Sequence, residues 1–220
     1  MALNANAIGL LRPYIKGDVL SLGYPNLLLD RFGCEKVFGF TPATVIDPPS
    51  TIKLIERHKG KKLAETRGVF AQLGAVLTCV DAVAHDGVDR IADLNYPQAL
   101  GEYDLVIDAG TIEHCFNIGQ ALINAANAVK IGGVILHTPP MTMVNHGFYN
   151  LCPTLFPHFY LANGFEMLFM AARGGRGEGG GVPIKENSNF DAEPGCALYV
   201  LAQRRERVPL VMPIQGKYMR

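Results

Sequence analysis

The stretch from Tyr103 to Pro140 constrains the fold more than any other part of the chain. Residues 103–108 form an apolar run that ends in an acid, which is typical of a buried strand. Residues 117–130 carry apolar side chains at helical spacing, and Gly132 and Gly133 are expected to end this helix. The apolar run after the glycines predicts a second strand. A strand, a helix and a strand in this order predict two parallel strands joined by a helical crossover.

Other segments extend this alternation to the rest of the chain. Residues 17–22 and 75–81 are apolar runs that predict buried strands. Residues 165–172 and 196–203 predict two final strands with no helix between them, and such strands pair antiparallel. The predicted fold class is therefore α/β, a doubly wound, mostly parallel sheet with an antiparallel C-terminal edge strand.

The length of 220 residues fits a single domain that spans residues 1–220. Residues 34–73 are expected to form a helical insert within it. The reason is that the spacing from Gly23 to Asp81 is much longer than the roughly 20 residues of a standard nucleotide-binding unit. Near the C-terminus, the glycine-rich residues 174–195 predict a flexible loop.

The segment between the first two strands is expected to be largely helical. Pro25 suits a first helical turn and Gly33 suits the residue beyond a helix end. Further helices are predicted at about 51–58 and 61–73. Basic residues in this segment permit two interpretations, a patch that faces a phosphate or sugar nucleotide and a solvated helix face. They are Lys53, Arg57, Lys59, Lys61, Lys62 and Arg67.

Charge and hydropathy exclude several classes of function. The chain has 20 basic and 20 acidic residues, so no overall field attracts it to nucleic acid or to an anionic membrane. A small-molecule or glycan substrate is expected instead, and homo-oligomerisation is left open. The sequence shows neither a basic leader nor an apolar run of the roughly 20 residues that a membrane span needs, so a cytoplasmic protein is expected.

The 5 scattered cysteines form no CxxC pair, which predicts free thiols and no metal site.

Polar and small residues follow four of the predicted strands, among them a short strand expected to end at Asp93, and a doubly wound sheet binds its ligands at such strand ends. Gly23 lets the backbone after the first strand approach a ligand, and the helix start beyond it offers free N–H groups. Asp81 can accept both hydroxyls of a ribose. Asp93 can accept a hydrogen bond from an adenine amino group while Leu94 packs on the ring. Taken singly, each has an ordinary alternative as a turn, a helix cap or a surface acid.

The fourth of these loops, residues 108–114, adds reactive groups. Its small residues at 109–111 let a ligand lie across the strand end, and Glu113 and His114 then face the cleft. A histidine with a pKa of about 6.5 can act as a general base or orient a substrate hydroxyl. His114 can equally serve to hydrogen-bond the loop together.

The run YDLVIDAGTIEHCFNIGQALINAANAVKIGGVILHTPP resembles the class I S-adenosylmethionine-dependent methyltransferases. The resemblance extends with decreasing clarity over 17–33 and 75–172, about two-thirds of the chain on the doubly wound template. It implies S-adenosyl-L-methionine as the cofactor and transfer of its sulfonium methyl group. It also implies cofactor contacts from Gly23, Tyr24, Pro25, Asn26, Asp81, Asp93, Leu94, Ala109, Gly110 and Thr111.

The first loop departs from the family pattern. The family usually has several glycines after an acid, whereas this chain has SLGYPN, with a single glycine and Ser21 where the acid is common. Tyr24 therefore either crowds the methionine pocket or forms one of its walls.

Residues 141–163 follow the fifth strand, where the family places substrate-contacting elements, and a helix is expected from about Pro153 to Asn163. The tract combines polar groups with aromatic rings, which suits a glycan or a small polar molecule. Glu113, Asn145 and Tyr149 are the substrate-binding candidates.

These features predict a methyltransferase that acts on a hydroxyl or amine of a small molecule or sugar. His114 and His146 are the candidate catalytic bases. The alternative is a methyltransferase-like protein without catalysis that acts as a binding or scaffold partner, which the unusual first loop suggests. A nicotinamide-dependent enzyme fits less well, because no GxGxxG motif follows the first strand.

Overall fold

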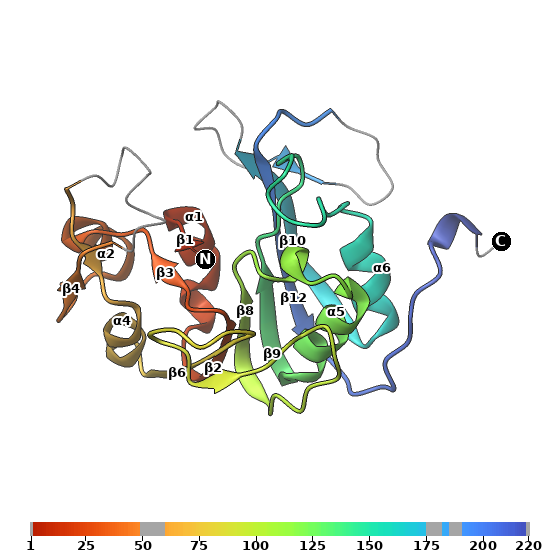
Figure 1. The fold of residues 1–220 in the computed structure, drawn as a ribbon, viewed down its shortest axis with the longest axis horizontal. Helices are drawn as coiled ribbons and strands as arrows, with labels where there is room; N and C mark the ends of the chain where they lie inside the picture. The colour runs from red at the N-terminus through yellow and green to blue at the C-terminus, as the bar shows by residue number, and fades with distance from the viewer. Residues whose placement is uncertain (1, 49–59, 175–181, 185–190, 219–220) are drawn as a thin grey trace.

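The computed structural model describes residues 2–48, 60–174, 182–184 and 191–218. Its described residues form a mixed α/β fold around an eight-stranded sheet with the order β11-β10-β12-β9-β8-β2-β6-β7 (Figure 1). The strands of this sheet are β2 (Gly17–Leu22), β6 (Ala75–Asp81), β7 (Arg90–Ile91), β8 (Tyr103–Asp108), β9 (Val129–His137), β10 (Phe165–Gly174), β11 (Val182–Pro183) and β12 (Cys196–Arg204).

Five neighbouring strands, β7, β6, β2, β8 and β9, run parallel. From β2 the chain continues first to β6 and β7 on one side and then to β8 and β9 on the other. The strand order therefore reverses between β2 and β8, and the carboxyl ends of the strands at such a point leave room for a ligand. The arrangement is consistent with a Rossmann-like fold.

The last strand is antiparallel as expected, but it does not lie at the edge of the sheet. β12 pairs antiparallel with β9 on one side and with β10 on the other. The prediction of a C-terminal edge strand is therefore wrong in this respect. An interior place gives β12 a hydrogen-bonded neighbour on each side, and the described strands at the two ends of the sheet are the short β7 and β11.

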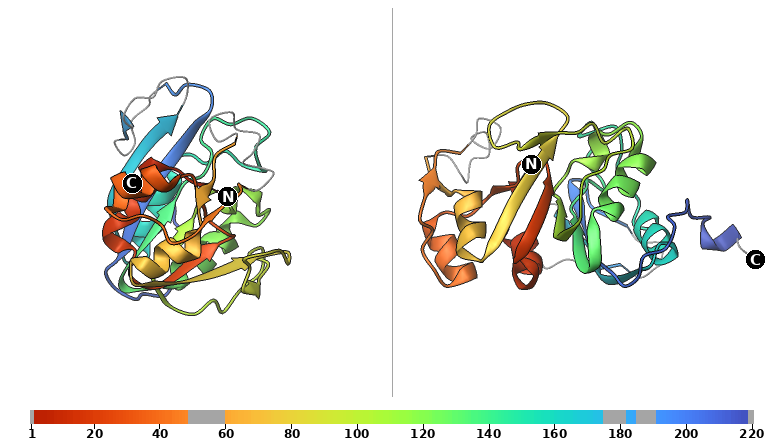
Figure 2. Two further views of the ribbon diagram at one scale, coloured as in Figure 1. Left: turned by 90° about the vertical axis from the view of Figure 1, so that its left-hand side faces the viewer. Right: turned by 90° about the horizontal axis from the view of Figure 1, so that it is seen from below.

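Helices cover both faces of the sheet. Helices α5 (Ile118–Asn127) and α6 (Leu155–Ala162) pack on one face. Helices α1 (Ala5–Leu11), α2 (Arg31–Phe38) and α4 (Thr66–Gln72) pack on the other face. Figures 1 and 2 show the two groups of helices on opposite sides. Successive residues of β2 supply both apolar layers, because strand side chains alternate between the faces.

Shorter elements complete the described chain. A parallel pair joins β1 (Ala2–Leu3) and β3 (Asn26–Leu27), and an antiparallel pair joins β4 (Val45–Ile46) and β5 (Leu63–Ala64). Single 3₁₀ turns occupy η1 (Arg12–Tyr14), η3 (Ile112–His114) and η4 (Gly216–Tyr218). Among the helices of the described residues, none combines the length and the apolar character that crossing a bilayer requires.

The helix expected at 117–130 is confirmed as α5, but it ends earlier than expected. Asn117 caps α5 by accepting a hydrogen bond from the Gln120 amide. Gly132 and Gly133 lie inside β9 and do not terminate the helix. At Gly133 a Cβ atom would come within 3.0 Å of the Tyr103 carbonyl oxygen, at an irregularity in the pairing of β8 with β9. Gly133 therefore permits a close backbone approach within the sheet.

The helix expected from Pro25 to Gly33 is wrong. The chain first forms β3, and α2 then begins after Asp30, whose side chain accepts a hydrogen bond from the Gly33 amide at 2.8 Å. Gly33 thus lies in the first turn of the helix, and Gly39 with φ +82° ends it. A good N-cap residue set the helix start six residues later than the proline signal indicated.

The expected insert at 34–73 holds the end of α2, then β4, β5 and α4. Helix α4 starts at Thr66 because Glu65 caps it, accepting hydrogen bonds from the amides of Arg67 and Gly68. The helix predicted at 51–58 lies outside the described residues, as does most of the loop predicted at 174–195. The expected helix at 153–163 is confirmed as α6.

Candidate cofactor and active site

A cavity of about 290 Å³ opens where β6, β7 and β8 end. This volume lies just below the range for small-molecule sites, roughly 300–1,000 Å³. The place beside the reversal of strand order is where a sheet of this kind binds ligands. The cavity is lined by Val80, Asp81, Ala82, Ala92, Asp93, Leu94, Asn95, Gly110, Thr111, His114 and Cys115.

Six residues predicted from the sequence meet in this lining. Asp81, Asp93, Leu94, Gly110 and Thr111 are the predicted cofactor contacts among them, and His114 is a predicted base. They come from three loops and converge because parallel strands end at one edge of the sheet.

The loop after β7 is held in place by helix α5. Asp93 accepts hydrogen bonds from the backbone amide and the side-chain amide of Asn95, at 2.9 and 2.8 Å. The buried Asn124 donates to the carbonyl oxygens of Leu94 and Tyr96, at 3.0 and 2.9 Å. Sequence reasoning missed Asn95 and Asn124, because each looked like an ordinary loop or helix residue without its partner.

Asp81 lies at the end of β6 with a partner from the following loop. The His85 Nε2 atom is 3.1 Å from one carboxylate oxygen of Asp81. This hydrogen bond is the largest cause of the raised pKa of His85. Because the His85 side chain is 43% exposed, it has room to turn away and free the carboxylate for another donor.

The turn after β8 is built on a buried carboxylate. Asp108 accepts hydrogen bonds from the amides of Thr111 and Ile112, at 2.9 and 3.3 Å. The Thr111 hydroxyl donates to the carbonyl oxygen of Leu22 at 2.5 Å, which ties the end of β8 to the end of β2. Gly110 has φ +94°, a conformation that favours glycine.

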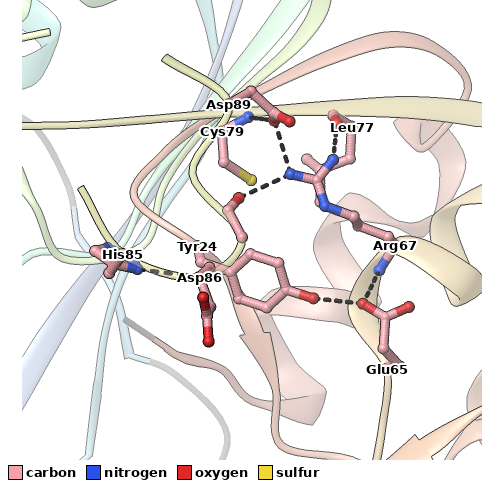
Figure 3. A network of polar contacts seen from close by, with 9 residues as sticks. Tyr24, Glu65, Arg67, Leu77, Cys79, His85, Asp86 and Asp89 are labelled. Atoms are coloured by element: carbon pink, nitrogen blue, oxygen red, sulfur yellow. Dashed lines mark hydrogen bonds and ion pairs between the residues drawn. The ribbon is translucent and has the colours of Figure 1, made fainter. Parts of the chain in front are cut away.

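The first loop does not reach the lining of this cavity. Tyr24 turns toward α4, where its hydroxyl donates to Glu65 at 2.5 Å, as Figure 3 shows. Its ring lies against Gly87, at which a Cβ atom would come within 2.5 Å of the ring. Burial, followed by the hydrogen bond to Glu65, raises the pKa of Tyr24 to about 12.

Neighbours of Tyr24 and of Gly110 are likewise absent from the cavity lining. Gly23, with φ +81°, donates its amide to the Val80 carbonyl oxygen at 2.6 Å. The Pro25 carbonyl oxygen accepts from Thr66, Asn26 belongs to β3, and Ala109 is buried in the apolar layer under α1, α2 and α4. The structure therefore does not bring these four predicted contacts, or Tyr24, into the cavity.

Arg67 has a structural role in the loop that covers Tyr24. Its guanidinium donates to the carbonyl oxygens of Leu77 and Gly87 and to the Asp89 carboxylate, at 2.6 to 2.7 Å (Figure 3). These bonds join α4 to β6 and to the loop after it. Among the other basic residues of this segment, Lys61 and Lys62 are exposed, and Lys53, Arg57 and Lys59 lie outside the described residues.

Glu113, His114 and His146 form a cluster at the rim of the cavity. Glu113 is 0% exposed, and neither of its carboxyl oxygens has a hydrogen-bond partner on another described residue. Its Oε1 atom lies 3.8 Å from His114 Nε2 and 3.5 Å from His146 Nε2. The two imidazole rings are 5.4 Å apart, centre to centre.

Burial perturbs the protonation of this cluster. Desolvation, with a smaller contribution from the Asp108 charge, raises the pKa of the Glu113 carboxyl to about 8. Desolvation and the neighbouring His146 lower the pKa of His114. Perturbed titratable groups beside a cavity are a common feature of functional sites.

Backbone contacts bring the segment around His146 to Glu113. The Glu113 carbonyl oxygen accepts hydrogen bonds from the amides of Phe148 and Tyr149, at 2.9 and 3.4 Å. At Gly147 a Cβ atom would lie 2.9 Å from the same oxygen, so only glycine allows the contact without a shift.

The other substrate-side candidates lie outside the cavity lining. Asn145 is exposed and adopts φ +62° in the turn that precedes His146. Tyr149 uses its hydroxyl to donate to the Phe116 carbonyl oxygen at 2.8 Å. The structure thus joins His114, His146 and Glu113, and it places Asn145 and Tyr149 beside them without cavity contacts.

A fully buried polar network behind the cavity went unrecognised in the sequence. His137 contacts the Asp108 carboxylate through Nδ1 at 2.6 Å and the Tyr160 hydroxyl through Nε2 at 2.5 Å. All three residues are buried. Asp108 and His137 end two strands that pair in register, and that correspondence is the signal that could have revealed the pair.

Comparisons with known proteins leave the family open. No family model and no curated protein matches the chain. TehB from Haemophilus influenzae matches in structure with a TM-score of 0.43 and 13% identity, over 79% of this chain and 66% of TehB. An alphavirus structure described as P23pro-zbd matches with a TM-score of 0.37 and 14% identity, over 90% of this chain and 22% of that one. The chain thus spans slightly less than two thirds of TehB, and similarity at this level identifies neither a family nor an activity.

Proposed function

We propose that this protein is an S-adenosylmethionine-dependent methyltransferase that acts on a hydroxyl or amine of a small molecule or sugar. Its sheet would correspond to the doubly wound arrangement of the class I enzymes. The observation that carries the proposal is the convergence of Asp81, Asp93, Leu94, Gly110 and Thr111 on one cavity beside the reversal of strand order.

The lining of the cavity suits an adenosine group. Two carboxylates, Asp81 and Asp93, offer acceptors for ribose hydroxyls and for an amino group. Leu94 offers an apolar surface for a ring, and Gly110 leaves open the space that a Cβ atom would occupy 3.1 Å from Glu113. S-adenosylmethionine supplies an activated methyl group when bound, so the protein mainly has to align the acceptor.

His114 and His146 are the proposed bases. His114 lines the cavity, and His146 lies beside it on the outer rim. The lowered pKa of His114 keeps its imidazole neutral near pH 7, and a neutral imidazole can accept the proton of a hydroxyl or amine. Glu113, Asn145 and Tyr149 remain the proposed substrate-side residues.

The second candidate is a methyltransferase-like protein without catalysis that acts as a binding partner. The position of Tyr24 favours this alternative, because the first loop turns toward Glu65 and contributes nothing to the cavity lining. Binding of S-adenosylhomocysteine, the product formed from the cofactor, separates the two candidate functions. A scaffold that has lost the cofactor site has no reason to retain affinity for this product.

We expect S-adenosylhomocysteine to bind the protein with one site in calorimetric titration. Asp81→Asn should weaken binding at least tenfold, because the amide replaces one acceptor by a donor that faces the ribose hydroxyls. Asp18→Asn is the matched control, since Asp18 lies at the opposite end of β2 and pairs with Lys130 on the surface. Absence of heat at millimolar ligand, or binding of a nicotinamide cofactor in its place, would contradict the proposal.

Tyr24→Phe tests whether the first loop matters for the cofactor. The variant loses the hydrogen bond to Glu65, so the free energy of unfolding should fall by about 1 kcal/mol. The affinity for S-adenosylhomocysteine should stay within threefold of the wild type, because Tyr24 does not line the cavity. Thermal unfolding and calorimetry on the same preparations measure both quantities. A large loss of affinity with unchanged stability would place Tyr24 in the cofactor site.

A further inference from the structure

The cluster of Glu113, His114 and His146 has the composition and spacing of an open metal site. One carboxylate oxygen and two imidazole nitrogens, one from each residue, all lie within 4.8 Å of one another. Ligands about 2.0–2.2 Å from a zinc ion in tetrahedral geometry are separated by roughly 3.4 Å. The separations of 3.8 and 3.5 Å from Glu113 Oε1 to the two imidazoles are close to that value.

Glu113 supplies an independent reason to expect an ion. A buried carboxyl is ordinarily hydrogen-bonded or paired with a charge, because removal from water is otherwise unfavourable. Glu113 is 0% exposed, and its carboxyl oxygens have no hydrogen-bond partner among the described residues. Its Oε1 atom instead faces two histidines that are about half exposed and can turn toward a shared ion.

The surrounding backbone holds the three ligands in place. Glu113 and His114 belong to the 3₁₀ turn η3, which the Asp108 carboxylate fixes through the amides of Thr111 and Ile112. The segment that carries His146 is held against Glu113 by hydrogen bonds from the next residues to the Glu113 carbonyl oxygen. The ligands are therefore positioned by contacts that do not depend on the ion.

We propose that Glu113, His114 and His146 bind a divalent transition-metal ion such as Zn²⁺. Two imidazoles with one carboxylate suit borderline metals and do not suit Mg²⁺ or Ca²⁺, which prefer oxygen ligands alone. Three protein ligands leave at least one coordination position open for a small molecule. The cysteine pattern could not reveal this site, because its ligands are histidine and glutamate from two separate segments.

The position of the ion deepens the proposed function, on which this part of the inference rests. His114 is both a ligand and part of the cavity lining, so the open position lies at the substrate edge of the cavity. A metal-bound acceptor hydroxyl has a lowered pKa and loses its proton to solvent more easily. With the ion bound, both imidazoles would hold it and the acceptor proton would pass to solvent, so the assignment of His114 and His146 as bases applies to the metal-free protein.

Titration of the metal-stripped full-length protein with Co²⁺ tests the site, since visible absorption reports the coordination of this probe directly. We expect one Co²⁺ per chain, displaced by Zn²⁺. Glu113→Gln, His114→Ala and His146→Ala should each weaken binding at least tenfold, because each removes one of three ligands. His158→Gln is the control, because His158 lies on α6 and hydrogen-bonds the Thr154 carbonyl oxygen away from the cluster. Circular dichroism establishes that each variant is folded.

Binding of Co²⁺ that all three variants retain, or no binding by the wild type, would overturn the metal site. Titration of the same preparations with S-adenosylhomocysteine separates this result from the proposed function. Metal binding without binding of S-adenosylhomocysteine supports the site and contradicts the methyltransferase. The reverse result supports the methyltransferase and overturns the metal site.

Discussion

Asp108→Ala is expected to lower the free energy of unfolding by about 3–5 kcal/mol, the usual loss when one partner of a buried polar pair is removed. Asp108 is buried and accepts hydrogen bonds from His137 and from the amides of Thr111 and Ile112. Alanine would remove the acceptor that these three donors share, and loss of a buried hydrogen-bond partner is strongly destabilising. Urea denaturation followed by circular dichroism measures the change.

Asp18→Asn provides the control for charge removal from a strand of the same sheet. Asp18 is exposed and pairs with Lys130, so its loss should change stability by less than about 1 kcal/mol. Combining Asp108→Ala with His137→Ala should lower stability by less than the sum of the single changes, because the two share one interaction. If Asp108→Ala is as stable as Asp18→Asn, the buried polar network around Asp108 does not contribute to stability.

Glu113→Gln is expected to make the metal-free protein more stable at alkaline pH. The pKa of Glu113 in the folded protein is raised to about 8, mainly by burial and then by the Asp108 charge. The neutral Glu113 carboxyl therefore stabilises the folded protein fully below the pKa of about 4.3 that it has in the unfolded protein. This stabilisation is lost as pH rises through 8. Glutamine keeps the neutral shape and cannot ionise, so its variant should not show this loss.

Urea denaturation between pH 5 and pH 9, with a chelator present, measures this effect. Above about pH 8 the free energy of unfolding of the variant should exceed that of the wild type by on the order of 2 kcal/mol. His114, His146 and Asp108 face Glu113 and are retained in both proteins. A difference that does not change with pH would show that Glu113 ionises normally.

Local patterns were sufficient to predict the strands and the helix that build the parallel half of the sheet. Apolar runs mark β2, β6, β8 and β9, and the periodicity of α5 with its Asn117 cap marks the crossover helix. These signals are strong because burial of one face or one stripe dictates the residue type at every position. The predicted cavity residues after β6, β7 and β8 followed from the same pattern, since parallel strands bring their carboxyl ends together.

Features that depend on partners far along the chain could not be predicted. Tyr24 turns away from the cavity because Glu65, forty-one positions later, accepts its hydroxyl proton in a hydrogen bond. The interior place of β12 depends on the unpaired edges that β9 and β10 present to it. No local feature of the sequence around Tyr24 identifies Glu65 as its partner, and none within β12 identifies β9 and β10.

The Tyr103–Pro140 stretch by itself determined the α/β class and the edge of the sheet at which a ligand would bind, because both follow from local periodicity. Only the tertiary structure decided which side chains meet there. It buried Glu113 without a hydrogen-bond partner among the described residues, and it brought His146 to His114 through a backbone contact that requires Gly147. The physical reason is that burial and close approach are properties of the packed chain, whereas periodicity is a property of each segment.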